Sequence, residues 1–179
     1  DHGEELCDHH MFRKARPYEG SCHIPLIISG GKKFLPKGAG SSRCSSVVEL
    51  RDIMPTLLDL ADAPVPDTVD GKSLLPLLED PARSVRPWLH GEHSFDEYSN
   101  HWIVTETDKY IWHSQTGQEQ YFHLEKDPHE LTDLIAEDAC KMRIQELRGH
   151  LIESLENRRE GFVENGRLVP GRPYPPVLS

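Results

Sequence analysis

The sequence predicts a mixed α/β chain with a buried strand, a small antiparallel sheet and a long helix near its C-terminus. Three observations support this fold class: an apolar run at residues 24–29, β-branched and aromatic runs between residues 88 and 124, and an apolar stripe at helical spacing over residues 138–158. The pattern of apolar residues changes near Pro87, which separates the two parts. A length of 179 residues is sufficient for a domain with its own hydrophobic core.

The first part of the predicted fold places a polar loop before the buried strand. Residues 24–29 are bounded by turn-forming residues and suit a strand that is buried on both faces. A helix is predicted over residues 52–61, with Asp52 as its N-cap and Pro55 in its first turn, where the missing N–H costs little. The leucine-rich residues 71–79 predict a short buried helical turn.

The second part predicts a small antiparallel meander. Its strands are the runs at residues 102–104, 110–112 and 120–122, and its turns are expected at residues 108–109 and 116–117. Aromatic side chains of this size contribute strongly to a core. The tryptophans are therefore predicted to be core residues of the meander: Trp88, Trp102 and Trp112.

The longest helix is predicted over residues 138–158, and residues 161–179 are expected to form an extended tail on the surface or against a partner. One face of the helix carries an apolar stripe at a spacing of three and four residues. The members of that stripe are Cys140, Ile144, Leu147, Leu151 and Leu155.

Composition limits the classes of partner. The net charge of −10 argues against a nucleic-acid-binding face and against docking on an anionic membrane. No apolar run approaches the roughly 20 residues that a membrane-spanning helix needs. The sequence indicates no compartment, because a targeting segment would precede Asp1. The cysteines lack CxxC spacing, which disfavours structural zinc and leaves disulfides open: Cys7, Cys22, Cys44 and Cys140.

The first three residues combine a carboxylate, an imidazole and a glycine. Asp1 and His2 are both competent metal ligands, and Gly3 lets the backbone turn both side chains inward. A carboxylate favours calcium, magnesium or manganese, while one imidazole also allows zinc. Lys14 offers a cation that could hold an anionic substrate. The alternative is a loop aspartate that caps a helix, beside an exposed histidine and a solvated lysine.

His93 ends a predicted strand, and strand ends can reach a cleft. It is therefore a candidate for substrate contact, against the alternative of a hydrogen-bonded polar residue without that role. Three further histidines of the amino-terminal region are expected to have structural roles rather than to bind a metal: His9, His10 and His23.

Four motifs follow one another along the chain: DHGE at 1–4 with Asp8-His9, Lys14, Tyr18-Glu19 and Ile24-Pro25-Leu26; DIMPTLLDL at 52–60; DGKSLLPLL at 70–78; and EQYFHL at 119–124 with Asp127-Pro128 and Glu130-Leu131. In this order and spacing they resemble the carboxyl-terminal part of sulfatases in the alkaline phosphatase superfamily. The resemblance covers residues 1 to about 155 and leaves the tail uncovered. It implies the carboxyl-terminal part of an alkaline-phosphatase-like sandwich.

The resemblance also implies roles for individual residues. Asp1 and His2 would supply two ligands of a divalent metal, with calcium the first expectation and manganese, magnesium or zinc as alternatives. Lys14 would bind the sulfate group and neutralise charge on its oxygens as the ester bond breaks. The expected partners are a sulfate-ester small molecule or glycan and the remainder of the sulfatase polypeptide, and an oligomer remains open.

The resemblance also implies that part of the catalytic site lies outside this sequence. Such sulfatases use a formylglycine made in a Cys/Ser-x-Pro-x-Arg motif, and none of the four cysteines is followed by that pattern. We therefore expect the formylglycine upstream and expect the chain alone to be inactive. Residues 1–86 would end the catalytic domain, residues 87–160 would form a carboxyl-terminal sheet with its helix, and residues 161–179 the tail.

Two other functions remain open from the sequence. A phosphodiesterase or phosphonate monoester hydrolase of the same superfamily would share the Asp-His and Lys arrangement. A non-catalytic assembly module could derive from the end of a sulfatase, although the presence of Asp1, His2 and Lys14 argues against it.

Overall fold

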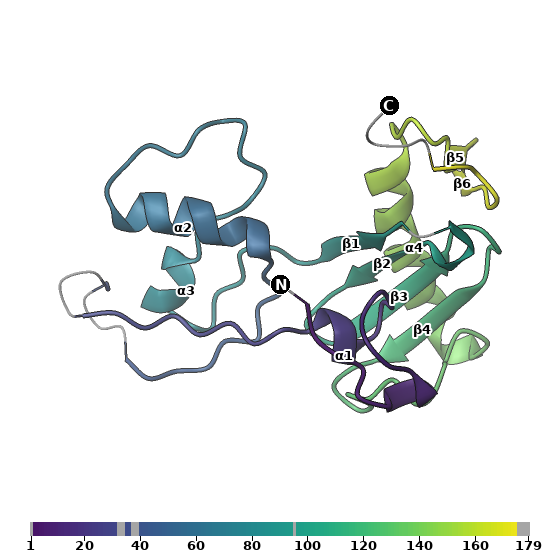
Figure 1. Ribbon diagram of the computed structural model, residues 1–179, viewed down its shortest axis with the longest axis horizontal. Coiled ribbons are helices and arrows are strands. Elements are labelled where there is room, and N and C mark those ends of the chain that lie inside the picture. Colours follow the sequence, from purple (N-terminus) through teal and green to yellow (C-terminus); the bar gives the residue numbers. More distant parts are fainter. Residues whose placement is uncertain (1, 32–34, 37–39, 95, 175–179) are drawn as a thin grey trace. The chain divides into compact units, whose positions relative to one another are not determined.

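The computed structural model describes residues 2–31, 35–36, 40–94 and 96–174 (Figure 1). The chain divides into two compact units. The first contains Pro25–Leu89, and the second combines His2–Ile24 with the described part of His90–Ser179. The amino-terminal loop therefore folds with the sheet of the second unit, although 65 residues separate them in sequence. The two units are described in turn.

The first unit contains the 3₁₀ turn η2 (Leu50–Asp52) and the helices α2 (Ile53–Leu60) and α3 (Leu75–Glu79), as the sequence predicts. Thr56 connects the two helices. Its hydroxyl donates to the Asp52 carbonyl at 2.6 Å and accepts from the Leu74 N–H at 2.9 Å. A buried hydroxyl that is satisfied on both sides fixes where α3 begins relative to α2.

Asp52 stands at the N-cap of α2, but its carboxylate does not cap that helix. It accepts two hydrogen bonds from the Arg86 guanidinium, at 2.6 and 2.5 Å, and further bonds from the backbone N–H groups of Lys72 and Glu49. Asp52 and Arg86 are both buried. The predicted cap is thus the acceptor of a buried ion pair that connects three segments of the first unit.

The strand predicted at residues 24–29 is wrong. In the described chain these residues form neither helix nor strand, and most of them are exposed. The physical reason is that a strand needs a hydrogen-bonded neighbour. The strands of the described residues pair within two sheets, and neither sheet includes this segment. An apolar run predicts burial, but it does not supply the partner strand.

The second unit is built on a four-stranded antiparallel sheet in the order β1-β2-β3-β4. Its strands are β1 (Leu89–His93), β2 (Asn100–Val104), β3 (Asp108–His113) and β4 (Glu119–His123). The predicted meander is confirmed. The turn after β3 is also confirmed, and Gly117 there has a positive φ of 77°, which glycine adopts without strain.

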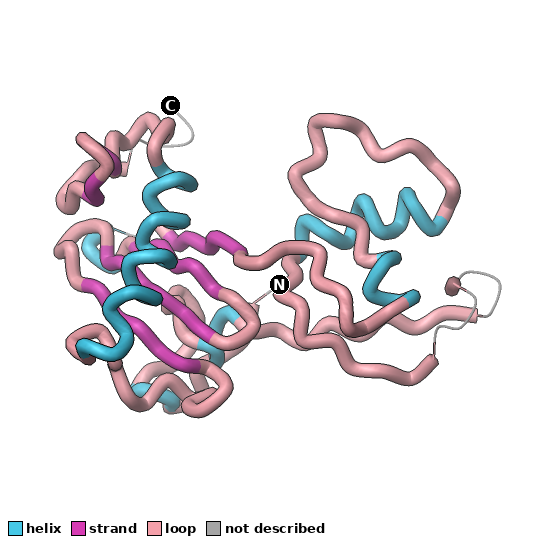
Figure 2. The backbone as a smooth tube through the Cα atoms, turned by 180° about the vertical axis from the view of Figure 1, so that it is seen from behind, coloured by secondary structure: helices cyan, strands magenta, loops and turns pink. Residues whose placement is uncertain are grey.

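Different segments cover the two faces of this sheet. On one face, the amino-terminal loop packs Tyr18 against Ile111 and Phe122. On the other, α4 (Lys141–Leu155) lies across β2 and β3 (Figures 1 and 2). The central strand β3 is therefore buried on both faces, which explains its continuous run of buried residues.

The predicted apolar stripe of α4 is confirmed at Ile144, Leu147, Leu151 and Leu155, which are all buried. The helix starts at Lys141, after the 3₁₀ turn η4 (Asp138–Cys140). Within the predicted extended tail the chain instead forms a small hairpin of β5 (Val163–Glu164) and β6 (Arg167–Leu168).

Two side chains predicted in a turn are buried in β3. Asp108 and Lys109 begin the strand, and each has charged partners: Asp108 pairs with Arg143, and Lys109 pairs with Glu19 and Glu130. A polar dipeptide between two apolar runs indicates a turn. Here ion pairs compensate the burial of both residues, so the strand begins two residues earlier.

The other expectations concern cysteines and tryptophans. The four cysteines are free thiols, and Cys7 and Cys44 are exposed. Of the three predicted core residues, Trp112 is buried, whereas Trp102 and Trp88 are only partly buried. None of the described helices is both long and apolar enough to span a bilayer.

Candidate functional site

The amino-terminal loop folds back on itself and is held by backbone hydrogen bonds. The Gly3 N–H donates to the Ser21 carbonyl at 2.8 Å, and the Glu5 N–H donates to the Arg13 carbonyl at 2.9 Å. A Cβ atom on Gly3 would lie 2.1 Å from the Gly20 carbonyl oxygen, so only glycine fits there. The backbone beside Lys14 is therefore held next to the segment that follows His2.

The hydrogen bond of His2 determines which ring nitrogen can bind a metal. His2 Nδ1 lies 2.8 Å from the Gly3 carbonyl oxygen. A carbonyl oxygen can only accept, so Nδ1 carries the proton and the lone pair is on Nε2. This is the tautomer in which metal-binding histidines are commonly held by a backbone carbonyl. Asp1, the other predicted ligand, lies outside the described residues.

Lys14 and His93 come from distant parts of the sequence into one electrostatic environment. Burial lowers the pKa of His93, and the positive charges of Arg16 and Lys14 lower it further. In β1, His93 lies on the same side as Gly91, where an added Cβ would lie 2.2 Å from the Trp102 ring. That side is the one covered by the amino-terminal loop, because Trp102 packs with Tyr18 and its cluster.

Arg16 adds a second cation that the sequence did not single out. Its guanidinium lies over the Tyr98 ring, 4.6 Å from the ring centroid, which is a cation–π arrangement. Lys14 is exposed and Arg16 is partly exposed. The two cations beside a neutral His93 form a positive region on a chain of net charge −10. Such a region suits an anionic group.

Beneath the loop lies a buried cluster of charged side chains. The Lys109 Nζ is 2.6 Å from Glu19 Oε1 and 2.8 Å from Glu130 Oε1. Burial opposes the charge of Lys109, but Glu130 and Glu19 outweigh it and raise its pKa. Burial also opposes ionisation of Glu19, yet the hydrogen bond with His23 and the Lys109 charge hold its pKa at about 2. This cluster anchors α1 (Glu19–Cys22) to β3.

Glu5 belongs to the same region but has no opposite charge bonded to it. It is fully buried, and neither carboxylate oxygen has a hydrogen-bond partner among the described residues. Burial raises its pKa to about 7, and the negative charges of Glu130 and Asp8 contribute to the rise. Lys109 and Arg16 act in the opposite direction. Nothing in the sequence singles out Glu5 beyond its position in a charged loop.

The remaining histidines of the loop have structural contacts. His9 stacks on Tyr18 with the ring centroids 4.1 Å apart, and His23 Nδ1 lies 2.6 Å from Glu19 Oε2. These contacts agree with the structural roles expected for them. His10 lies exposed at the end of the 3₁₀ turn η1 (Asp8–His10).

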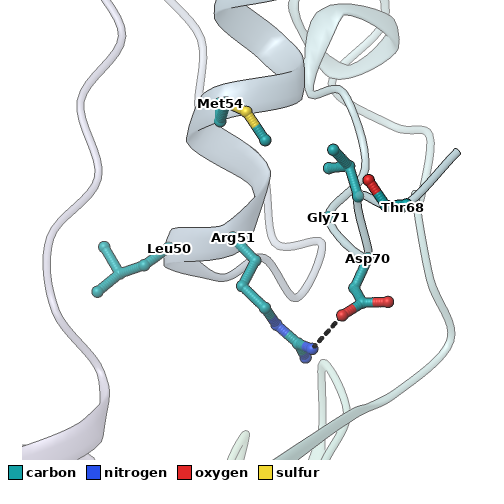
Figure 3. Close-up of a pocket in the computed structure, with 7 residues that line it drawn as sticks. Leu50, Arg51, Met54, Thr68, Asp70 and Gly71 are labelled. Carbon is teal, nitrogen blue, oxygen red and sulfur yellow. Dashed lines mark ion pairs between the residues drawn. The ribbon is translucent and has the colours of Figure 1, made fainter. Parts of the chain in front are cut away.

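A surface pocket of about 380 Å³ lies in the first unit, beside α2 (Figure 3). Arg51 and Asp70 form an ion pair across it at 3.9 Å. Among the described residues that line it, none is a predicted site residue: Leu50, Arg51, Met54, Thr68, Val69, Asp70 and Gly71. The pocket is thus not the polar site of the amino-terminal loop.

Together, these observations define a mixed α/β domain in which the amino-terminal loop and α4 cover the two faces of an antiparallel sheet. Residues 7–159 match the family model described as N-sulphoglucosamine sulphohydrolase, C-terminal. The chain therefore belongs to the sulfatase family, through its carboxyl-terminal domain.

Two relatives show the extent of the likeness. The chain is 51% identical over 173 residues to an arylsulfatase of Clostridium perfringens, a match that covers 97% of this chain and 36% of that protein. It is 41% identical over 145 residues to arylsulfatase K of Gallus gallus, covering 75% of this chain and 26% of that protein. The chain thus spans about a third or less of these relatives' lengths.

Solved structures support the same fold. A putative sulfatase from Bacteroides thetaiotaomicron superposes with a TM-score of 0.77 at 22% identity, over 96% of this chain and 39% of that one. The protein BT4656, solved with its substrate D-glucosamine-2-N,6-O-disulfate, superposes with a TM-score of 0.74 at 26% identity. The match covers 87% of this chain and 32% of that one. The phosphonate monoester hydrolase of Agrobacterium radiobacter gives 0.70 at 25% identity, over 96% and 38%. The predicted resemblance to sulfatases is confirmed.

Proposed function

We propose that this chain is the carboxyl-terminal part of a metal-dependent sulfatase that hydrolyses sulfate esters. The observation that carries the proposal is the 51% identity to an arylsulfatase over 97% of the chain. A sulfated small molecule or glycan is the proposed substrate class. Its support is the structural neighbour solved with a sulfated glucosamine as its substrate.

In this proposal Asp1 and His2 hold a divalent metal, calcium in the first instance, and His2 binds it through Nε2. The metal, when bound, acts as a Lewis acid that polarises a sulfate oxygen. The His2 geometry fits this role, because the Gly3 carbonyl holds the ring in the tautomer that a ligand needs. Asp1 contributes the carboxylate that distinguishes a hard-metal site from a site of imidazoles alone.

Lys14 is proposed to bind the sulfate oxygens. An ammonium group is a compact positive charge, which suits an oxyanion whose charge grows as the ester bond breaks. Arg16 supports the same electrostatic environment, and Tyr98 holds its guanidinium in place. His93, kept neutral by burial and by the two cations, is proposed as a hydrogen-bonding contact for the substrate.

The test uses the complete enzyme that contains this chain. Replacing His2 with Ala should abolish sulfatase activity and weaken binding of calcium, measured separately by calorimetry. His129→Ala, at an exposed position of the second unit, is the matched control and should change neither. Activity and calcium binding at parental levels in the His2→Ala protein would refute the ligand assignment.

A second candidate function is phosphonate monoester hydrolysis, which the superposition on the Agrobacterium radiobacter enzyme favours. The two functions are separated by measuring kcat/KM of the complete enzyme on an aryl sulfate and on the matching aryl phosphonate monoester. A preference for the sulfate supports the first proposal, and a preference for the phosphonate supports the second.

A further inference from the structure

A second cluster of potential metal ligands lies on the opposite side of the sheet from Lys14. His90 and Glu92 in β1 lie two residues apart and so on one side of the strand. His101 in the neighbouring strand β2 faces them. The ligand atoms of these three side chains all lie within 4.8 Å of one another.

We propose that His90, Glu92 and His101 form a zinc site that joins the edge strand β1 to the rest of the sheet. The ligand set of two imidazoles and one carboxylate favours zinc over calcium, which prefers oxygen ligands. None of these three ligands is shared with the metal proposed for Asp1 and His2. Its three ligands belong to the second unit alone.

The distances agree with tetrahedral coordination. His90 Nε2 lies 3.2 Å from His101 Nδ1, and Glu92 Oε2 lies 3.4 Å from the same nitrogen. In a tetrahedral zinc site with bonds of about 2.0–2.1 Å, neighbouring ligand atoms are about 3.3 Å apart. These two distances are therefore close to the edges of such a tetrahedron, and the fourth position would be taken by water.

A chain of hydrogen bonds directs the lone pair of His101 toward the cluster. The Ser114 hydroxyl donates to the Ser99 carbonyl at 3.2 Å, and that carbonyl can only accept. Ser114 Oγ, 2.9 Å away, then accepts from the Tyr174 hydroxyl. Tyr174 in turn accepts from His101 Nε2 at 2.8 Å. Nε2 therefore carries the proton, and Nδ1 presents its lone pair to His90 and Glu92.

The surroundings keep His101 neutral and fixed in place. Its ring is fully buried, stacks near Trp112 with a centroid distance of 5.8 Å, and meets Phe162 edge-on at 5.0 Å. Burial of the ring disfavours its charged form. A neutral, oriented imidazole with its second nitrogen hydrogen-bonded is the form that binds zinc.

Glu92 also pairs with Arg158 just beyond α4, at 3.0 Å. Zinc at this site would thus join β1, β2 and the residues after the helix. Because β1 also carries His93 on its other side, the zinc would hold the strand that presents the proposed substrate contact. The alternative is a hydrogen-bonded cluster, in which His90 Nε2 donates to His101 Nδ1 and no metal binds.

The test measures zinc binding by the purified chain in competition with a chromophoric chelator, with cobalt as a spectroscopic probe of geometry. The starting protein carries His2→Ala, which removes the proposed catalytic ligand. We expect one equivalent of zinc, a visible cobalt spectrum of tetrahedral intensity, and a rise in melting temperature with zinc.

The variants His90→Gln and Glu92→Gln should each weaken zinc binding at least about tenfold and remove the tetrahedral cobalt spectrum. Both residues are at least partly exposed, so these variants do not depend on replacing the buried His101. The double variant His9→Ala/His10→Ala controls for adventitious binding by the loop histidines and should bind zinc like the starting protein. Zinc affinity that is unchanged in the two glutamine variants, or lost only in the loop variant, would overturn the proposal.

Discussion

Lys14 is proposed to act through its charge and its compact ammonium group, and this can be tested at the level of one side chain. In the complete enzyme, Lys14→Ala should lower kcat/KM on an aryl sulfate by about 10²–10³-fold, the usual loss when one stabilising donor is removed. Lys14→Arg should retain part of the activity, because it keeps the charge but changes the geometry. The control Lys126→Ala, at an exposed site after β4, should have parental kinetics.

The Lys14 prediction has a second readout. Because the Lys14 charge lowers the pKa of His93, its removal should let that pKa rise, measured by NMR titration of the imidazole. Parental kcat/KM and an unchanged His93 titration in Lys14→Ala would contradict both the role and the proximity of the two residues.

Glu5 should make stability depend on pH. Its pKa is about 7 in the folded chain and 4.5 as the ordinary value, so the folded state holds the proton more tightly than the unfolded state. The contribution of Glu5 to the free energy of unfolding should therefore be greatest below pH 4.5 and should fall as pH rises to about 7. The whole difference is at most about 3 kcal/mol.

The variant Glu5→Gln isolates this effect, because it mimics the protonated carboxyl at every pH. We expect it to match the parent near pH 4 and to be more stable above pH 7, measured by urea unfolding. Comparing the two proteins at each pH cancels the opposite contribution of Glu19, whose pKa is lowered to about 2. Glu125→Gln, at an exposed position, is the control. A stability difference that does not change with pH would exclude the titration of Glu5.

Among the contacts between elements, the ion pair of Asp52 and Arg86 should contribute strongly to the stability of the first unit. Removing one partner leaves the other charge buried without compensation, at a cost of about 3–5 kcal/mol. Asp52→Asn should therefore lower the free energy of unfolding by an amount of this order. Asp70→Asn removes the exposed partner of Arg51 and should cost less than about 1 kcal/mol. Equal losses of unfolding free energy in the two variants would show that burial of the Asp52–Arg86 pair does not cause the destabilisation.

The elements with local signals were predictable from the sequence, and those that depend on distant partners were not. The helix α2 and the buried face of α4 follow from apolar spacing and a proline in the first turn. Residues 24–29 also form a clear local apolar pattern. A strand, however, requires a hydrogen-bonded neighbouring strand, which this pattern cannot supply.

The candidate site divides in the same way. Lys14 and His93 are candidates from the sequence because a motif and a strand end single them out, and the structure places the Lys14 charge where it lowers the pKa of His93. The sequence does not single out three other residues, because their surroundings depend on contacts across the fold. Arg16 lies over an aromatic ring, whereas Glu5 and Lys109 lie near the buried carboxylate of Glu130. A charged residue in sequence looks the same whether it is solvated or buried with partners.

We expect the isolated chain to be inactive on sulfate esters. By proposal it contributes a lysine and two metal ligands, whereas the nucleophile is expected upstream. The assay is hydrolysis of a chromogenic aryl sulfate by the purified chain, with the complete enzyme as the positive control. Turnover that co-purifies with the chain through a second, independent affinity tag would show that it carries its own nucleophile.

The first unit should associate with another polypeptide, because it exposes two groups of large apolar side chains. One group lies at residues 26–28 and the other on α2. Ile27 is 86% exposed and Leu57 in α2 is 61% exposed. Apolar surface gains roughly 25 cal/mol for each Å² removed from water, and exposed apolar surface of this kind often marks an interface. Since the chain spans 36% of the Clostridium perfringens arylsulfatase, the remainder of the sulfatase polypeptide is the expected partner.

Light scattering of the isolated chain should therefore show association that increases with concentration. The variant Ile27→Ser/Leu57→Ser should reduce it, whereas Leu131→Ser/Met142→Ser removes two exposed apolar side chains from the second unit and should not. Co-expression with the upstream polypeptide should replace self-association by a one-to-one complex, because both would cover the same side chains. A chain that stays monomeric at all concentrations and ignores the upstream polypeptide would show that these residues form no interface.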